Sequence, residues 1–327
     1  MLGSGGRWGN VGRVTTGNGQ RSVHTGGGLV GWVPFLLPGV IWGASFLFIA
    51  EGLESFDPMG VTFLRVLFGF VTLAVFPAAR RPVRRADHGR IAVLGVIWMA
   101  FPLSMFPFAE QHVSSALTGM LNGATPIFVT IVAMAIARRA PSRGIVVGLA
   151  VGVLGAVLIA LPGPGEGSSS LGAIGMILVA LVSYGFALNL ASGLQQRNGG
   201  LPVIWRALGV AVVLTAPFGI PAVLDGRPHP VPMLSLVCLG CLGTGAAYVI
   251  LTNNAGRGGA ARASASTFLI PVVSLVLGVA LRGDDVAVLS IAGCAVCLFG
   301  AYLVGRAREH AAIVAPQGSP AIAVDGA

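Results

Sequence analysis

The chain has 327 residues, a mean hydropathy of +0.86, 55% hydrophobic residues and 9% charged residues. Soluble domains carry about 25% charged residues, so this composition excludes an ordinary soluble domain. The formal net charge of +9 comes from arginines that lie mainly between apolar runs. This placement argues against a nucleic-acid partner and favours the lipid bilayer as the protein's surroundings.

Ten apolar runs are long enough to cross a bilayer, which takes about 18 to 20 residues as a helix. They predict an all-α integral membrane protein, with segments 1–31 and 306–327 as disordered cytoplasmic tails. The glycine-rich start lacks the apolar core of a signal peptide. The predicted helices cover residues 32–51, 58–79, 91–110, 114–137, 144–162, 171–194, 201–224, 233–254, 260–281 and 286–305.

The arginines predict the topology. All twenty basic residues are arginine. If the N-terminus is cytoplasmic, sixteen fall on cytoplasmic segments; Arg227 and Arg282 fall on outer loops, and Arg65 and Arg206 lie inside helices. This asymmetry follows the positive-inside rule and predicts a multi-pass protein of the bacterial inner membrane with both termini in the cytoplasm.

An internal repeat divides the chain. Residues 148–160 (GLAVGVLGAVLIA) recur 145 positions later as residues 293–305 (GCAVCLFGAYLVG). Similar offsets relate other positions, including Pro126 to Pro271, Trp42 to Tyr184 and Arg65 to Arg206. Each unit holds five predicted helices, an odd number, so the second unit must enter the membrane in the opposite orientation. The sequence therefore predicts two inverted five-helix repeats, an architecture typical of alternating-access transporters.

Several segments resemble a known family. IWGASF, FDPMGVTFLR and ATPIF in the first half, and LGTGAAYVILTNNAGRGGAARASASTFLIPVVSLVLG in the second, are similar to EamA-type repeats of the ten-helix drug/metabolite transporter superfamily. The resemblance covers residues 32–305 and implies a first repeat at 32–162 and a second at 171–305. It also implies a secondary transporter, most often an exporter of amino acids, other metabolites or drugs. The chain departs from the family where a Gly-Glu pair often follows helices 4 and 9: residues 137–139 read Ala-Arg-Arg and residues 282–285 read Arg-Gly-Asp-Asp.

Six residues are candidates for substrate binding. Arg65 lies seven residues inside its predicted helix, and a buried arginine in a membrane needs a partner. Its guanidinium would hold a carboxylate or phosphate; alternatively, it forms a structural ion pair with Glu51 or Glu110, or extends to the membrane surface. The other five candidates would line a cavity or pack against neighbouring helices: Trp42, Trp98, Asn122, Tyr184 and Tyr248.

Pro126 and Pro271 are predicted to kink two equivalent helices, because each removes one backbone hydrogen bond. The carbonyls that lose their partners belong to Asn122 and Thr267. Paired kinks of this kind would frame the cavity and flex during transport, or would only shape the bundle.

Gly144, Gly148 and Gly152 form a small-residue stripe, with Gly293 in the matching helix of the second repeat. Such stripes let two helices approach closely, either within the chain or across a homodimer. The two CxxC pairs, at 238–241 and 294–297, lie in apolar helices, where cysteine packs as a small hydrophobe. We therefore expect no metal and no cofactor.

Energy coupling is the least specified property. Proton-coupled transporters usually place an ionisable residue on the transport path, and Glu51 and Glu110 are the candidates. The preferred hypothesis is a secondary transporter that exports a small amino-acid-like metabolite or a drug by alternating access. The alternatives are an uptake carrier, a flippase for a phosphorylated or lipid-linked metabolite, and a membrane-embedded enzyme, for which the sequence offers no cluster of catalytic residues.

Overall fold

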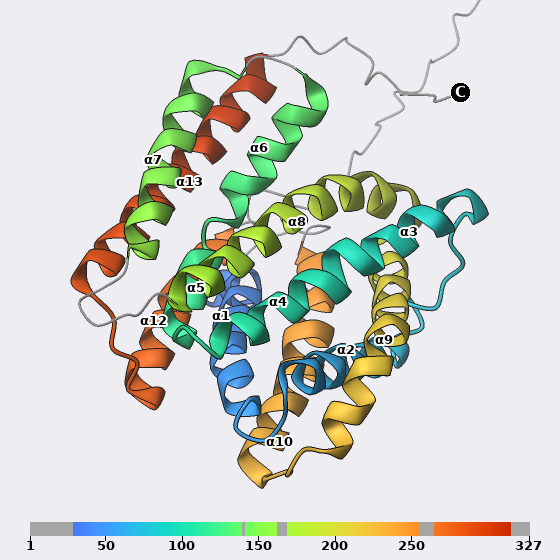
Figure 1. The fold of residues 1–327 in the computed structure, drawn as a ribbon. Coiled ribbons are helices and arrows are strands. Elements are labelled where there is room, and N and C mark those ends of the chain that lie inside the picture. Colours follow the sequence, from blue (N-terminus) through green and yellow to red (C-terminus); the bar gives the residue numbers. More distant parts are fainter. Residues whose placement is uncertain (1–28, 139–140, 162–168, 255–264, 315–327) are drawn as a thin grey trace, which may run out of the picture. The chain divides into compact units, whose positions relative to one another are not determined.

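The computed structural model describes residues 29–138, 141–161, 169–254 and 265–314 (Figure 1). Within these ranges all regular structure is helical, which confirms the predicted all-α class. Internal contacts divide the chain into Met1–Val33 and Pro34–Ala327, and the packing described below is that of the second unit.

The first half contains five predicted membrane crossings, two of which are interrupted. The third crossing joins α3 to α4 through a π-helical segment, η2, and the fourth is divided into α5 and α6. The elements are α1 (Leu29–Gly52), α2 (Pro58–Ala74), η1 (Arg85–Asp87), α3 (His88–Leu94), η2 (Gly95–Ala100), α4 (Phe101–Glu110), α5 (Ser115–Asn122), α6 (Thr125–Ala137) and α7 (Arg143–Ala160).

The second half follows the same order, with a second π-helical segment, η3, in its third crossing. After η3 the chain stays helical through residues 247–254. The elements are α8 (Ser169–Asn198), α9 (Gly200–Leu224), α10 (Pro230–Cys238), η3 (Leu239–Ala246), η4 (Ala265–Phe268), α12 (Leu269–Leu277), η5 (Gly278–Arg282) and α13 (Val288–Val314).

Eight of these helical stretches are long and apolar enough to cross a bilayer, and two shorter apolar stretches, Pro58–Ala74 and Ser266–Arg282, complete the ten. Both predicted tails include residues that are helical in the structure. Helix α1 begins at Leu29 rather than residue 32, and α13 continues to Val314 instead of ending at residue 305. The rest of both tails lies outside the described residues.

The contacts between helices repeat when the two halves are exchanged. Gly95 in η2 lies so close to α9 that an added Cβ would be 2.8 Å from the carbonyl oxygen of Ala207. Gly240 in η3 lies equally close to α2: a Cβ added there would be 2.9 Å from the carbonyl oxygen of Arg65. Because each half contacts the other through equivalent residues, the halves are related by a pseudo-two-fold axis. With five crossings in each half, that axis must lie in the membrane plane, which makes the repeats inverted.

This register corrects one pairing inferred from the sequence. Gly95 and Gly240 are equivalent, so the residues they approach, Ala207 and Arg65, are equivalent as well. The pairing of Arg65 with Arg206 is therefore wrong by one residue. One residue corresponds to 100° around a helix, so the two arginines point in different directions.

The predicted small-residue stripe packs inside the chain. Helices α7 and α13 lie side by side (Figure 1), and their glycines face each other's backbone. A Cβ on Gly148 would lie 3.1 Å from Gly300 O, and a Cβ on Gly293 would lie 2.9 Å from Gly155 O. Gly144 faces Ala307, and Gly152 faces Ile127. Since α13 and α6 occupy this stripe, it does not serve a second copy of the chain.

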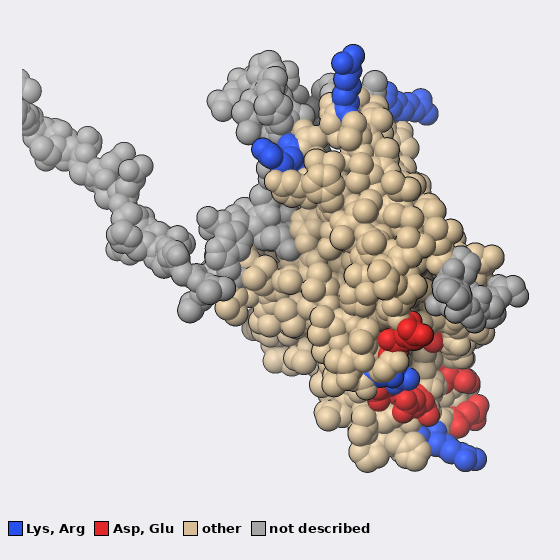
Figure 2. All heavy atoms as spheres, turned by 90° about the vertical axis from the view of Figure 1, so that its left-hand side faces the viewer, with Lys and Arg blue, Asp and Glu red and all other residues tan. Residues whose placement is uncertain are grey.

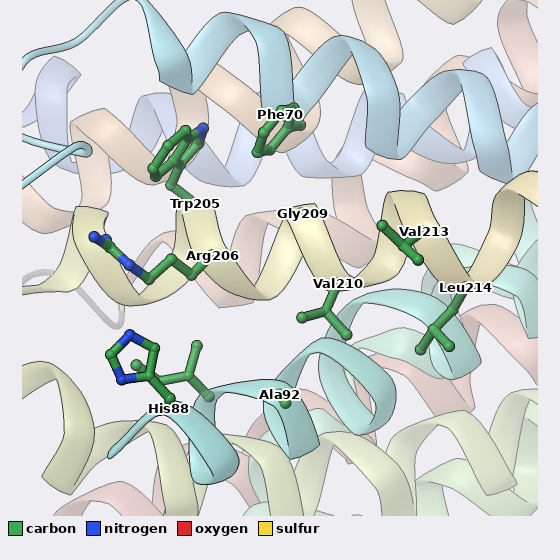
Figure 3. Close-up of a pocket in the computed structure, with 10 residues that line it drawn as sticks. Phe70, His88, Ala92, Trp205, Arg206, Gly209, Val210, Val213 and Leu214 are labelled. Atoms are coloured by element: carbon green, nitrogen blue, oxygen red, sulfur yellow. The ribbon is translucent and has the colours of Figure 1, made fainter. Parts of the chain in front are cut away.

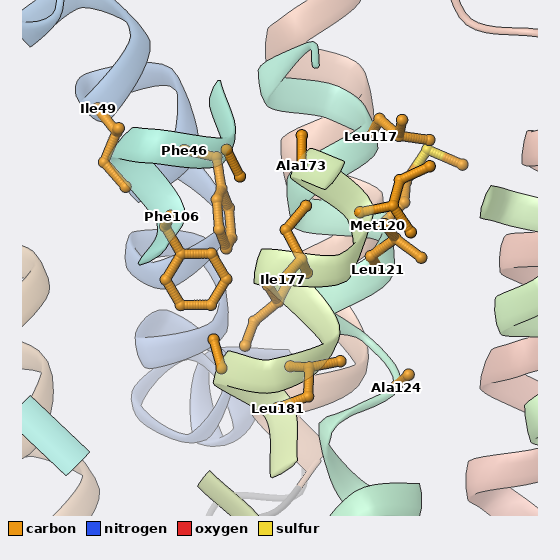
Figure 4. Packing of buried hydrophobic residues seen from close by; sticks show 14 of the residues in the cluster. Phe46, Ile49, Phe106, Leu117, Met120, Leu121, Ala124, Ala173, Ile177 and Leu181 are labelled. Carbon is orange, nitrogen blue, oxygen red and sulfur yellow. The ribbon is translucent and has the colours of Figure 1, made fainter. Parts of the chain in front are cut away.

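A buried apolar core joins helices from both halves. Figure 4 shows Phe46 of α1 beside Phe106 of α4, with Leu121 of α5 and Ile177 of α8 packed nearby. The rings of Phe46 and Phe106 meet edge to face, with centroids 5.6 Å apart. This core forms one wall of the cavity described next.

Candidate substrate cavity

A cavity of about 390 Å³ lies between the helices of the first repeat and the helices of the second repeat, within residues 34–327. All six candidate residues from the sequence line it, together with further side chains from α1, α4, α6, α8, η4, α12 and the helical residues 247–254. The lining consists of Trp42, Ser45, Phe46, Arg65, Trp98, Leu103, Phe106, Asn122, Thr125, Tyr184, Leu188, Tyr248, Leu251, Ser266, Thr267 and Ile270. The wall is mainly apolar and aromatic, with one charged residue.

Arg65 supplies that charge. Its side chain extends from the middle of α2 and is 7% exposed. Nε donates a hydrogen bond to Oγ1 of Thr244, at 3.2 Å, and among the described residues this is its one hydrogen bond. None of the ion pairs in the described part of the chain includes Arg65, so the predicted pairing with Glu51 or Glu110 is not formed.

The π-helical segments shape the polar side of the cavity. A π turn is wider than an α turn and often marks a functional site. Segment η3 provides Thr244 for Arg65 and the carbonyl of Gly243, which accepts a hydrogen bond from Nε1 of Trp42 at 2.9 Å. Segment η2 carries Trp98. The apolar sequences of both segments match an ordinary helix, so sequence reasoning missed the π turns.

Three aromatic side chains form a connected cluster on one wall. The Tyr248 ring meets Trp42 at 5.6 Å and 64°, and meets Trp98 at 5.6 Å and 78°. Both contacts are edge-to-face, the geometry that aromatic pairs favour. Tyr184 lies near Phe106, with ring centroids 6.0 Å apart. The cluster gives the cavity flat apolar surfaces beside the Arg65 guanidinium.

The two prolines lie at helix starts rather than at mid-helix kinks. Pro126 is in the first turn of α6, after a break at Gly123 and Ala124, and Pro271 is in the first turn of α12, after η4. The carbonyl of Asn122 finds a new donor, because Oγ1 of Thr125 bonds to it at 2.6 Å. The chain thus breaks the fourth crossing beside the cavity, which brings Asn122 and Thr125 onto its lining, whereas η4 continues directly into α12.

One end of the helix bundle is joined by ionic and polar contacts, and we call it the acidic end. Nη1 of Arg282 binds Glu51 at 2.7 Å and Glu54 at 3.0 Å. Asp284 accepts hydrogen bonds from Oγ of Ser115 at 2.7 Å and from N of Ala116 at 2.9 Å. These contacts connect α1, η5 and the start of α5.

Figure 2 shows that the acidic side chains on the visible face gather towards one end, whereas the opposite end shows arginines alone. This separation of charge agrees with the distribution along the sequence.

Glu110 lies one turn beyond Phe106, at the end of α4. Both carboxyl oxygens are buried and have no hydrogen-bond partner among the described residues. The Glu110 carboxyl group interacts electrostatically with three charged residues, Arg65, Asp284 and Arg282. A buried carboxyl group without partners is costly to ionise, so Glu110 differs from Glu51, which Arg282 pairs.

The cysteines contribute to packing. Cys294 and Cys297 are buried in the α7–α13 contact, where an added Cβ on Gly155 would meet the backbone nitrogen of Cys297. In the described part of the chain, no three His, Cys, Asp or Glu residues come together in a way that would hold a metal ion.

A multi-pass helical bundle with two inverted repeats around a buried cavity defines a class, the membrane transporters built by duplication. The model of the EamA-like transporter family matches residues 29–161 and again residues 171–306. The chain belongs to this family, and it is a transporter rather than an enzyme.

Known proteins show the same relationship. An uncharacterized transporter of Archaeoglobus fulgidus is 23% identical over 85% of this chain and 99% of its own length. A probable terminal-alkyne amino-acid exporter of Streptantibioticus cattleyicolor is 28% identical over 82% of this chain and 90% of its own. The uncharacterized inner membrane transporter YedA of Escherichia coli K12 is 25% identical over 81% of this chain and 87% of its own length. One solved crystal structure shares the fold, with a TM-score of 0.61 and 17% identity over 85% of this chain and 97% of that one.

Proposed function

We propose that this transporter exports a small amino-acid-like solute across the bacterial inner membrane by alternating access. One observation carries the proposal: a single buried arginine faces a cavity whose wall is mainly aromatic and apolar. Both halves of that cavity come from one chain, so the proposal requires no second copy.

The arginine favours a carboxylate. A guanidinium offers five N–H donors in a planar fork that matches a carboxylate. Thr244 uses one donor of Arg65, at Nε, which leaves the two Nη groups for a solute. An arginine at membrane depth is costly without a partner, and a bound carboxylate would provide one.

The aromatic walls favour a solute with an apolar part of limited size. A cavity of about 390 Å³ lies near the lower end of the usual range for small ligands, about 300–1,000 Å³. The faces of Trp42, Trp98 and Tyr248 would also attract a cation, as in the drug-export alternative. Arg65 shares the same cavity and repels a cation, so the amino-acid-like solute is preferred.

The name of one relative supports export. The Streptantibioticus cattleyicolor protein is named as a probable amino-acid exporter, which agrees with a carboxylate at Arg65 and with export. The arginine-rich end would be cytoplasmic by the positive-inside rule, with both termini on that side. The acidic end, joined through Arg282, would then close the cavity towards the outside.

Counterflow in proteoliposomes tests the proposal. Labelled amino acids and labelled cationic drugs are offered separately to the wild type, Arg65→Gln, Arg65→Lys and the exposed-loop control Arg227→Gln. We expect amino-acid flux in the wild type and in Arg227→Gln, reduced flux in Arg65→Lys, and a loss of about 100-fold in Arg65→Gln, since charged hydrogen bonds contribute about 1.5–3 kcal/mol. Melting curves verify that each variant is folded. Drug flux that is indifferent to Arg65 would replace this proposal with multidrug export.

We also propose that Glu110, rather than Glu51, links transport to protons. A negative charge on Glu110 would oppose a solute carboxylate at Arg65, whereas a protonated Glu110 would not. A proton bound there therefore favours solute binding and would travel in the same direction as the solute. Export would then not use proton antiport, and the outward gradient of the solute would have to be steep enough to carry the proton outward against the proton-motive force.

The pH dependence of solute affinity separates these roles. Wild-type protein should bind the solute more tightly as the pH falls. Glu110→Gln should bind with an affinity that no longer changes with pH, because the amide mimics the protonated carboxyl group. Glu51→Gln should keep the wild-type pH dependence, and an unchanged pH response in Glu110→Gln would refute the role of Glu110.

A further inference from the structure

A second hollow lies away from the substrate cavity, on the outer surface of the helices. This lateral groove has a volume of about 490 Å³ and lies between α2, α3 and α9 (Figure 3). The ring of Phe70 stacks on Trp205 along one side, with centroids 5.3 Å apart and planes within 5°. Gly209 keeps the floor low, since a Cβ there would already lie 3.2 Å from the Phe70 ring.

One end of the groove is cationic. Figure 3 shows Arg206 and His88 extending to the same end. Nη1 of Arg206 donates to the carbonyls of Pro202 at 3.1 Å and Ala79 at 3.4 Å, and its Cζ lies 5.5 Å from the Trp205 ring centroid. These contacts fix the guanidinium but do not neutralise it, because none of the ion pairs in the described part of the chain includes Arg206.

The rest of the groove is apolar and faces the lipid. Val210, Val213 and Leu214 line it beyond Gly209, and Val213 is 71% exposed. They belong to α9, a stretch long and apolar enough to cross the membrane. Arg206 lies about 9 Å inside the start of α9, and Leu214 about 12 Å deeper, at 1.5 Å per residue. The groove thus runs from headgroup depth into the hydrocarbon.

Among the described residues, the equivalent position in the other half lacks this cationic end. The register set by Gly95 and Gly240 makes Leu64 the equivalent of Arg206 and Met233 the equivalent of His88. The related position at the acidic end therefore carries apolar residues in place of Arg206 and His88.

The segment before α3 and the first turn of α3 add further positive charge at the same end. Five exposed arginines lie between residues 80 and 90, namely Arg80, Arg81, Arg84, Arg85 and Arg90. Basic pockets between membrane helices on the cytoplasmic side bind the headgroups of anionic lipids, and each nearby arginine contributes about 1 kcal/mol to attraction by an anionic membrane.

We propose that this groove binds one anionic phospholipid, with its phosphate at Arg206 and His88 and an acyl chain along Val210, Val213 and Leu214. The lipid would lie against α2 and α9, which belong to different repeats and move relative to each other in alternating access. The site is separate from the substrate cavity and does not depend on which solute is carried.

Native mass spectrometry of the purified full chain tests the proposal, with phosphatidylglycerol and phosphatidylcholine as probes. We expect wild-type protein to retain one phosphatidylglycerol in preference to phosphatidylcholine. Arg206→Leu, which copies Leu64 of the other half, should weaken retention of phosphatidylglycerol about fivefold. Gly209→Leu, which fills the groove without changing charge, should reduce retention of both lipids at this site.

Two controls keep the test decisive. Arg80→Gln removes an exposed arginine at the same end but outside the groove and should weaken retention clearly less than Arg206→Leu. Arg227→Gln removes one from the loop between α9 and α10 and should retain phosphatidylglycerol like the wild type. The proposal is overturned if Arg206→Leu and Gly209→Leu retain the lipid fully, if Arg80→Gln loses as much as Arg206→Leu, or if the wild type does not distinguish the two lipids. Should Arg206→Leu fail to fold, Gly209→Leu alone decides the outcome.

Discussion

Arg65 and Thr244 join the two repeats at the cavity: Nε of the arginine, in the first repeat, donates to Oγ1 of the threonine, in the second, at 3.2 Å. The hydroxyl also lies 3.4 Å from the carbonyl of Leu239, one π turn earlier. The threonine thus holds the guanidinium in one orientation, with its two Nη groups directed away from the bond.

Replacing Thr244 with valine should therefore weaken solute binding while leaving the arginine in place. The loss of one hydrogen bond to a charged group, about 1.5–3 kcal/mol, predicts a rise in KM of tenfold or more with a smaller change in maximal flux. Thr215→Val is the matched control, because Thr215 is also buried and bonds a helix carbonyl, that of Ala211. Equal effects of the two substitutions would show that the Thr244 effect is only structural.

Tyr248 should contribute through its ring more than through its hydroxyl. The ring contacts both Trp42 and Trp98, and aromatic pairs contribute about 0.5–1.5 kcal/mol each beyond burial. Tyr248→Ala should raise KM for solutes with apolar side chains by about tenfold, whereas Tyr248→Phe should stay within about twofold of the wild type. Tyr302→Ala, at an exposed position on α13, serves as the control, and an inactive Tyr248→Phe would contradict the role of the ring.

The ionic contacts at the acidic end should differ in strength. Glu51 binds Arg282 at the shorter distance and its side chain is 21% exposed, against 55% for Glu54. Double-mutant cycles on melting stability, built with Arg282→Gln, should give a coupling of up to about 1 kcal/mol for Glu51 and close to zero for Glu54. A larger coupling free energy for Glu54 than for Glu51, or no coupling for either residue, would mean that Arg282 does not hold this end closed.

The contact between α7 and α13 should tolerate no added methyl group at Gly155. A Cβ there would clash with the backbone nitrogen of Cys297, and backbone cannot move aside as a side chain can. Gly155→Ala should lower stability by about 1–3 kcal/mol, the usual cost of overpacking. Gly175→Ala in α8, where nothing lies within 4 Å, should leave stability unchanged or raise it, because alanine is the better helix former.

The ten crossings could be predicted from the sequence because apolar length depends on the bilayer and not on tertiary contacts. The cavity residues could be predicted because a charged or polar-edged side chain inside an apolar helix needs a partner in the bundle. The π segments could not, because η2 and η3 differ from an α-helix in hydrogen-bond spacing and not in composition. The sequence predicts a kink at Pro126 where the structure has a helix break, because proline occurs both in the first turn of a helix and at a kink within a continuous one.

The register error at Arg206 shows where matching positions between repeats fails. In the sequence, an arginine aligned with an arginine is the natural choice. The contacts of Gly95 and Gly240 show that Arg65 instead corresponds to Ala207. A shift of one residue turns a side chain by about 100° around its helix, and Arg206 lines the lateral groove.

Duplication gave this cavity two equivalent halves, yet its positive charge lies in one of them. Because Ala207 stands where a second guanidinium would be, a solute anchored at Arg65 would have a single way to lie in the cavity. It would keep the same end towards α2 whichever side of the membrane is open, so the protein would translate its cargo without turning it over.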